Sequence, residues 1–235
     1  APHFLTGTGQ QHEGEPVVTT AFHGASAIVS GGAGGLGEAT VRRLHAEGLG
    51  VVIADLAEDK GKALTDELGS GAAFVSTDVT DEDSVRRAIE TANGLGTLRY
   101  GVVAHGGWGV AQRIVQRDGS PADYAGFTKT IDLYLNGTYN LLRLVAASVV
   151  ATEPAENGER GALVMTASIA GYEGQVGQTA YAAAKAGVIG LTIAAARDLA
   201  AAGIRVNTVA PGTMKTPIME SVGADAIAAF AANVP

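Results

Sequence analysis

Tyr181 and Lys185 stand four residues apart in the stretch TAYAAAKAG, whose alanines favour a helix. On a helix, residues at this spacing lie on one face, with roughly 5–6 Å between their Cβ atoms. An ammonium group about 4–5 Å from a phenol stabilises the phenolate and lowers its usual pKa of about 10 by ~2–3 units. The pair therefore predicts a tyrosine that acts as general acid and base, tuned by the lysine. An aromatic anchor beside a solvated lysine is the alternative interpretation.

Ser168 ends the largely apolar run ALVMTAS, 13 residues before Tyr181. We expect the end of this strand and the start of the next helix to meet at one edge of the sheet. A hydroxyl there can donate a hydrogen bond to a substrate carbonyl oxygen and orient the substrate beside the phenol. A serine after a strand is also common as a turn or helix-capping residue, and that interpretation stays open.

A glycine-rich segment, SGGAGGLG, follows the first apolar run and precedes a helical pattern. Its residues Gly31, Gly35 and Gly37 have the spacing G-x-x-x-G-x-G. Glycines let the backbone turn sharply and approach a pyrophosphate, which the N–H groups of the following helix can bind. The segment therefore predicts a nucleotide site, although a glycine-rich turn without a ligand has the same composition.

Asp55 ends the second apolar run. A carboxylate in this place can accept hydrogen bonds from both hydroxyls of an adenosine ribose, and it would repel a 2′-phosphate. The next two residues, Leu56 and Ala57, bring no cation, so the sequence favours NAD over NADP. After the third run, Asp78 and Val79 are placed to flank the adenine, unless Asp78 merely caps the next helix.

Six short apolar runs alternate with helical patterns from Ala25 onward, which predicts a parallel sheet with helices on both faces. The expected fold class is α/β, a Rossmann-type doubly wound sheet in a single domain over residues 25–235, with ligands at the carboxyl ends of the strands. Residues 1–24 are expected to be a flexible extension. We expect one long helix over residues 127–152 and a loop over residues 110–126.

The composition limits the classes of protein that fit. Hydrophobic residues make up 46% and charged residues 17% of the 235, which suits one globular domain. A net charge of −8 disfavours a nucleic-acid partner, and the absence of cysteine excludes disulfides and thiolate chemistry. Charges interrupt the apolar stretches, so no membrane partner is expected, and the first residues lack the features of a signal peptide. We expect a cytoplasmic protein that binds no metal.

Taken together, these motifs occur in the order found in the short-chain dehydrogenase/reductases, and the sequence resembles that family from about Ala25 to Pro235. The resemblance implies that Tyr181 is the acid and base, that Lys185 also binds the nicotinamide ribose and that Ser168 positions the substrate. It further implies that Asn136, in LYLNGTYN, holds a water for proton relay. The cofactor-binding residues that it implies are Ser30, Gly31, Gly35, Leu36, Gly37, Asp55, Leu56, Asp78, Val79, Tyr181, Lys185 and, in PGTMKT, Pro211, Gly212 and Thr216.

Residues 157–206, with EGQVGQ and ARDLA, resemble one branch of that family, the short-chain (type 2) 3-hydroxyacyl-CoA dehydrogenases, also known as mitochondrial-type 17β-hydroxysteroid dehydrogenases. This implies a 3-hydroxyacyl-CoA substrate in fatty acid metabolism, with a steroid alcohol or ketone second. Reduction of a 3-oxoacyl carrier protein is disfavoured by Asp55, because that reaction usually prefers NADPH. By the same resemblance Gln175 and Gln178 lie near the substrate, unless they only order a loop. The resemblance also implies a homotetramer in which the helices around Asn136 and Tyr181 pair between subunits.

The sequence departs from the family pattern in AHGGWG, where Ala104 and His105 replace the expected N-x-A-G. We expect His105 to support the loop and Trp108 to cover the site. The family's last helix and strand are expected to be missing after Pro235, and the N-terminal extension has no counterpart.

Two other classes of protein compete with this interpretation. A scaffold protein on the same fold would not need the intact Ser168, Tyr181 and Lys185. A nucleotide-fold methyltransferase also uses a glycine-rich turn and an acid, but does not need the Tyr–Lys pair. A serine hydrolase is disfavoured because no G-x-S-x-G occurs and every histidine precedes residue 106.

Overall fold

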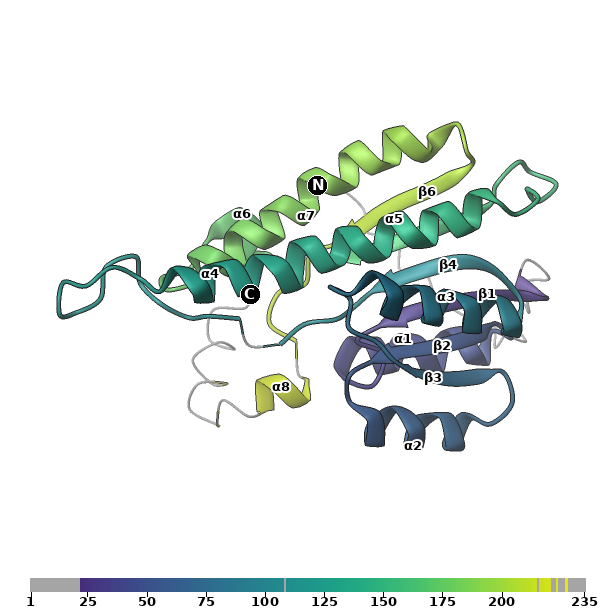
Figure 1. The fold of residues 1–235 in the computed structure, drawn as a ribbon, viewed down its shortest axis with the longest axis horizontal. Coiled ribbons are helices and arrows are strands. Elements are labelled where there is room, and N and C mark those ends of the chain that lie inside the picture. Colours follow the sequence, from purple (N-terminus) through teal and green to yellow (C-terminus); the bar gives the residue numbers. More distant parts are fainter. Residues whose placement is uncertain (1–21, 108, 215, 221–222, 224–226, 228–235) are drawn as a thin grey trace, which may run out of the picture.

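The computed structural model describes residues 22–107, 109–214, 216–220, 223 and 227. They form a six-stranded parallel sheet in the order β3-β2-β1-β4-β5-β6 (Figure 1). The order reverses between β1 and β4, so their carboxyl ends form the switch point where doubly wound sheets bind ligands. This confirms the predicted fold class. The strands are β1 Ala25–Ser30, β2 Gly50–Asp55, β3 Ala72–Ser76, β4 Thr97–Val103, β5 Gly161–Thr166 and β6 Ile204–Val209.

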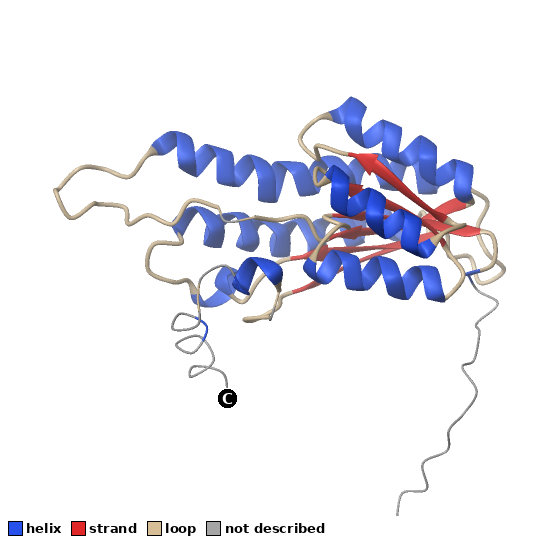
Figure 2. Ribbon diagram, turned by 90° about the horizontal axis from the view of Figure 1, so that it is seen from below, coloured by secondary structure: helices blue, strands red, loops and turns tan. Residues whose placement is uncertain are grey.

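Helices cover both faces of the sheet (Figure 2). One face carries α1 (Gly35–Ala46) and α2 (Glu58–Leu68), while the other carries α3 (Glu82–Leu95), α5 (Gly137–Val150) and α7 (Thr179–Ala200). The shorter helices are α4 Tyr124–Ile131, α6 Ala170–Glu173 and α8 Pro217–Glu220.

The central strands supply both hydrophobic cores, because successive side chains of a strand point to opposite faces. Both sets are almost completely buried, as expected for parallel strands covered on two sides. Ala27, Val29, Val51 and Ile53 pack in one core, and Ile28, Val52 and Ala54 in the other.

A π-helical turn, Asp132–Asn136, separates α4 from α5. The helix predicted over residues 127–152 thus begins three residues earlier, at Tyr124, and is not a regular α-helix throughout. A π turn closes its hydrogen bonds between residues i and i+5, which changes where its side chains point relative to α-helical spacing. This matters for the site described below.

The structure also bears on two segments that were expected to be irregular, the N-terminal extension and the loop before α4. The Phe22 ring lies edge-on to Tyr100 of β4, with centroids 5.6 Å apart, so the described end of the predicted extension contacts the sheet. The loop predicted over residues 110–126 is irregular over residues 109–123 but ends three residues early, because α4 begins at Tyr124, and it projects away from the sheet as an arm (Figure 1). A bridge between Gln112 and Gln178 joins this arm to the start of α7.

Helix α7 is long and apolar enough to cross a membrane by length and composition alone, with a mean hydropathy of 1.3 over its most apolar window. In this fold it packs against β6 and α6 instead. Only 33% of that window is buried, so much of its apolar surface faces outward.

Candidate active site

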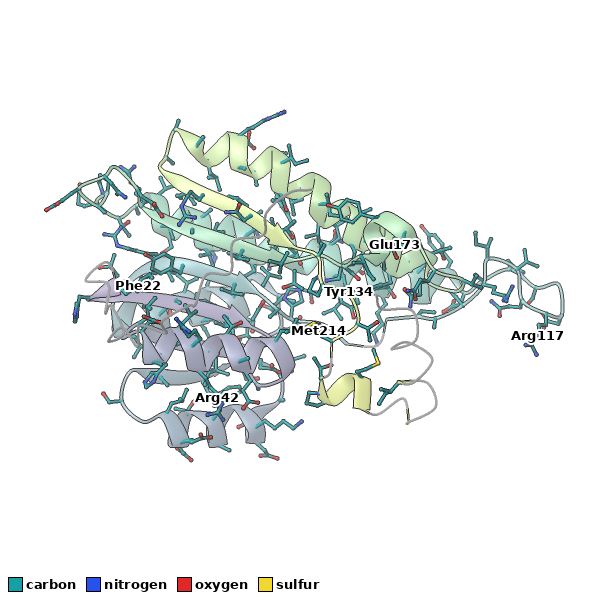
Figure 3. All side chains as sticks on the ribbon, turned by 180° about the vertical axis from the view of Figure 1, so that it is seen from behind. Phe22, Arg42, Arg117, Tyr134, Glu173 and Met214 are labelled. Carbon is teal, nitrogen blue, oxygen red and sulfur yellow. The ribbon has the colours of Figure 1, made fainter. Side chains whose placement is uncertain are left out.

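A cavity of about 360 Å³ lies at the carboxyl ends of the strands. Its walls come from the loops after β4, β5 and β6, from the start of α7 and from the base of the arm. Tyr134 and Met214, which both line it, are labelled near the middle of the molecule in Figure 3. The predicted site residues that line it are Leu36, Ser168, Gln175, Gln178, Tyr181, Lys185, Pro211, Gly212 and Thr216.

Lys185 is held inside this cavity by α7. Its side chain is buried, and its ammonium nitrogen donates a hydrogen bond of 2.6 Å to the carbonyl oxygen of Thr166 at the end of β5. The same nitrogen lies 5.6 Å from the centre of the Tyr181 ring. Burial lowers the pKa of Lys185 to about 8. The four-residue spacing therefore brings the two side chains together, as the sequence predicts.

Ser168 lies where β5 gives way to the short helix α6. Its hydroxyl oxygen accepts a hydrogen bond of 3.1 Å from the N–H of Ala170 and lines the same cavity as the Tyr181 phenol. Burial raises the pKa of Tyr181 above its ordinary value of 10, while the Ser168 hydroxyl acts in the opposite direction. The sequence-based expectation was a phenol pKa lowered by Lys185. In this structure burial has the larger effect on the phenol.

Tyr134, in the π turn, is part of the site, and sequence reasoning missed it. It is buried, and its ring stands nearly perpendicular to that of Tyr181, with centroids 5.0 Å apart. The Lys185 nitrogen lies 4.7 Å from the centre of the Tyr134 ring, closer than it lies to the Tyr181 ring. A tyrosine between two leucines, in LYL, was the signal available for it.

Asn136 does not lie where the proton-relay prediction requires. Its side chain is exposed and donates a hydrogen bond of 2.7 Å to the carboxylate of Asp132, and it is not one of the described residues that line the cavity. The π turn explains the difference, because side chains within it do not follow the α-helical spacing that the prediction assumed. Tyr134 faces Lys185 instead.

His105 joins the loop after β4 to Ser30 of β1 and to Leu133 of the π turn. This is the loop-supporting position expected for it. Its Nε2 lies 3.1 Å from the carbonyl oxygen of Leu133, and its Nδ1 lies 2.8 Å from the hydroxyl of Ser30. Since a carbonyl only accepts, we assign the hydrogen to Nε2, and Nδ1 then accepts from Ser30. Burial lowers the pKa of His105 to about 4, so the imidazole is neutral near pH 7. Trp108 lies outside the described residues.

The glycine-rich segment forms a tight turn between β1 and α1. Gly31 has a φ of +68°, and a Cβ there would lie 2.5 Å from the His105 Cα. A Cβ on Gly37 would lie 2.0 Å from the carbonyl oxygen of Gly31. Gly34 caps α1 without a side chain, and a Cβ on it would meet no described atom within 4 Å. This open approach to a helix N-terminus fits the pyrophosphate of a dinucleotide.

Asp55 fixes the end of β2 beside that turn. Its carboxylate accepts hydrogen bonds of 3.0 Å from the N–H of Ala33 and 2.9 Å from the N–H of Ala57. These bonds hold the carboxylate at the switch edge of the sheet, where an adenosine ribose would lie in a doubly wound fold. Together with the glycine turn, the residues present fit a nicotinamide dinucleotide.

The other predicted cofactor residues lie around the same edge. The carboxylate of Asp78 accepts from both the N–H and the hydroxyl of Thr80, so it orders its own turn, while Asp81 caps α3. Val79 is buried against α5, and Leu56 is exposed. A Cβ on Gly35 would lie 3.4 Å from Thr216, which places these two predicted residues side by side.

Comparison with known proteins identifies relatives of this chain. A model of the family described as short chain dehydrogenase matches residues 25–227. The human 3-hydroxyacyl-CoA dehydrogenase type-2 is 39% identical over 213 residues, which is 90% of this chain and 82% of that protein. The 3-alpha-(or 20-beta)-hydroxysteroid dehydrogenase of Mycobacterium tuberculosis strain H37Rv is 35% identical over 206 residues, covering 86% and 74%.

One solved structure is much more similar. The crystal structure of 3-hydroxyacyl-CoA dehydrogenase type-2 from Mycobacterium avium is 82% identical in sequence and has a TM-score of 0.89. The match covers 92% of this chain and 84% of that one.

Proposed function

Since this chain belongs to the short-chain dehydrogenase family, we propose that it is an NAD(H)-dependent enzyme that interconverts 3-hydroxyacyl-CoA and 3-oxoacyl-CoA thioesters. Family membership makes it an oxidoreductase that acts on the CH–OH group of a small molecule with a nicotinamide cofactor. The observation that supports the proposal most is the meeting of Ser168, Tyr181 and Lys185 in one cavity. The relatives named 3-hydroxyacyl-CoA dehydrogenase type-2 support the thioester as substrate.

In the oxidative direction the Tyr181 phenolate takes the proton of the substrate hydroxyl. The Ser168 hydroxyl donates to the same oxygen as it becomes a carbonyl, which keeps the reacting carbon oriented. When bound, the nicotinamide supplies the hydride chemistry. The Lys185 ammonium, already held by Thr166, stabilises the phenolate, so that Tyr181 can release the proton to solvent before the next turnover. In reduction the phenol returns its proton to the substrate oxygen.

The preference for NAD over NADP follows from Asp55. Its carboxylate is fixed by two backbone N–H groups, so it cannot easily turn away from an incoming 2′-phosphate. The ribose hydroxyls of NAD can donate to the same oxygens. We therefore propose NAD as the cofactor of this enzyme.

A hydroxysteroid is the second candidate substrate. It is favoured by the 35% identical relatives named 3-alpha-(or 20-beta)-hydroxysteroid dehydrogenase and by the apolar residues that line the cavity, such as Val110, Met214 and Met219. Gln175 and Gln178 line the same cavity and are the polar groups available to a thioester carbonyl or a sterol hydroxyl.

Oxidation of NADH in the presence of acetoacetyl-CoA tests this function. NADPH and a steroid ketone serve as comparison reactants on the same preparation. We expect fast turnover with the thioester and NADH, and slow turnover when either is replaced. Turnover of the steroid alone would establish the second candidate, and tight NADH binding without turnover of any ketone would contradict both.

We propose further that the enzyme is a homotetramer that pairs through α5 and α7. Both helices present large apolar side chains to solvent, with Tyr139 52% and Ile193 55% exposed. Burying such side chains between two copies of the chain would remove apolar surface from water.

A further inference from the structure

The Lys185 ammonium is enclosed by aromatic rings. Its nitrogen lies 4.7 Å from the centre of the Tyr134 ring and 5.6 Å from that of Tyr181. A cation over the face of a ring at this distance is attracted by the ring quadrupole, and more strongly when buried. Tyr134 is 3% exposed, so little water competes for the ammonium on that side.

The hydroxyl of Tyr134 makes a separate set of contacts. It accepts a hydrogen bond of 2.9 Å from the N–H of Gly107 and donates to the Gly107 carbonyl oxygen. A Cβ on Gly106 would lie 3.4 Å from the ring, so the loop passes directly over it. With His105 bonded to the carbonyl of Leu133, consecutive residues of the π turn hold the loop after β4 against the cavity.

We propose that Tyr134 is a positioning residue with two separable roles: its ring face holds the Lys185 ammonium in place, and its hydroxyl fastens the Gly106–Gly107 loop to the cavity wall. Tyr134 thus lies beside Lys185, while Asn136, which was expected to hold a water for proton relay, bonds to Asp132 outside the cavity. A charged lysine is what the Tyr181 phenolate needs, so the ring supports the base through Lys185. The inference rests on the proposed function where turnover or NADH binding is measured, whereas the titration of Lys185 does not depend on it.

The other groups facing Lys185 are few among the described residues. His105 approaches from the loop after β4 and is neutral near pH 7. Tyr181 approaches from α7, and the Thr166 carbonyl from β5. Asp55 and Asp78, at the ends of β2 and β3, act through their negative charge on His105. Removal of the Tyr134 ring also removes the edge contact that it makes with Tyr181.

Two substitutions separate the two roles. Tyr134→Phe keeps the ring and removes the hydroxyl, whereas Tyr134→Leu removes both while filling part of the volume. The protein is labelled with ¹³C at the lysine Cε, and the Lys185 signal, identified by its loss in Lys185→Met, is titrated by NMR. We expect the pKa of Lys185 to stay near the wild-type value in Tyr134→Phe and to fall by about one unit in Tyr134→Leu. NADH affinity, measured by fluorescence, should weaken by about tenfold in both variants. The Gly107 N–H loses its acceptor, and the loop that it belongs to packs through His105 against Gly31 of the glycine turn that would bind the cofactor.

The pH profile of kcat/KM for alcohol oxidation gives an independent readout. A less charged lysine stabilises the phenolate less, so the acidic limb should move to higher pH in Tyr134→Leu and stay in place in Tyr134→Phe. A Lys185 pKa that is unchanged or higher in Tyr134→Leu would overturn the ring role, as would an equal fall in Tyr134→Phe. Unchanged NADH affinity in Tyr134→Phe would overturn the loop role. If Tyr134→Leu does not fold, Tyr134→Met supplies the same comparison, and the NMR titration stands even if the proposed substrate is wrong.

Discussion

Ser168 combines the two roles that its place in the sequence leaves open. Its oxygen accepts from the N–H of Ala170 at the start of α6, which is the local, turn-forming role. The same hydroxyl lines the cavity together with Tyr181, which is the place that the proposed catalytic role needs. Because the turn bond fixes the side chain before substrate arrives, the hydroxyl is already oriented toward the cavity. The turn-forming role and the proposed catalytic role of this residue are therefore compatible.

The proposed preference for NAD rests on the charge of Asp55, and the first prediction at the residue scale removes that charge. Asp55→Ala removes the acceptor for the ribose hydroxyls and the repulsion of a 2′-phosphate. We expect the ratio of kcat/KM with NADH to that with NADPH to fall by at least about tenfold, which is roughly 1.4 kcal/mol. Asp59→Ala, an exposed residue on α2, removes the same charge and should leave the ratio unchanged. An unchanged ratio in Asp55→Ala would separate this residue from cofactor choice.

His105 gives the protein a pH-dependent stability. The pKa of His105 is about 4 in the folded protein, against an ordinary value of 6.5. As the pH falls below 6.5, His105 therefore becomes protonated in the unfolded chain while it stays neutral in the folded one. The free energy of unfolding should therefore fall by about 2 kcal/mol between about pH 7 and about pH 5 from this residue alone. His105→Gln keeps a donor for Leu133 and an acceptor for Ser30, but cannot titrate.

Urea unfolding at several pH values measures this effect. We expect the pH slope to be shallower in His105→Gln than in the wild type, whereas His23→Gln, at an exposed histidine, should keep the wild-type slope. Equal slopes in all three proteins would show that burial of His105 is not the cause.

At the scale of elements, the start of α1 depends on a close backbone approach. A Cβ on Gly37 would lie 2.0 Å from the Gly31 carbonyl oxygen, so Gly37→Ala must displace the glycine turn from the helix. We expect a loss of stability of about 1–3 kcal/mol in urea unfolding and at least tenfold weaker NADH binding. Gly94→Ala is the matched control, because Gly94 lies on an exposed face of α3 with no described atom within 4 Å of its Cβ position. That substitution should be neutral or stabilising. NADH binding by Gly37→Ala at wild-type strength would contradict the role given to this turn.

The strands and helix α7 could be predicted from the sequence. Apolar runs ending in Ser30, Asp55 and Thr166 reveal the strands, because both faces of a parallel sheet are buried. The spacing of Tyr181 and Lys185 reveals their shared face, because α7 is a regular helix. Both predictions depend on standard geometry, which amino-acid patterns reflect directly.

The π turn could not be predicted from the sequence. Asn136 and Tyr134 are two residues apart, and which of them enters the cavity depends on where each side chain points. That direction is set by the hydrogen bonds between residues i and i+5 in this one turn. The direction in which the pKa of Tyr181 is shifted could not be predicted for a similar reason. It depends on how deeply the phenol is buried, which is a property of the packed site and not of the four-residue spacing.

At the scale of the whole molecule, the exposed apolar faces of α5 and α7 predict that copies of the chain associate through these helices. Ile193→Asp places a charge where the proposed tetramer would bury a 55% exposed isoleucine. We expect light scattering after gel filtration to show a tetramer for the wild type and a smaller species for this variant. Leu56→Asp, which follows β2 and is 67% exposed, should leave the assembly unchanged. A wild-type mass in Ile193→Asp would exclude this face as the interface.

The central claim is that Tyr181 transfers the proton in an NAD-dependent reaction at the Ser168–Tyr181–Lys185 site. The most direct test compares the turnover of acetoacetyl-CoA and NADH by Tyr181→Phe with that of the wild type, with NADH binding followed by fluorescence. Tyr172→Phe, at a 68% exposed tyrosine, is the control. We predict that Tyr181→Phe binds NADH normally and that its kcat falls by at least about 10²–10⁴-fold, while Tyr172→Phe retains full activity. A kcat within a few-fold of the wild type in Tyr181→Phe would contradict the claim.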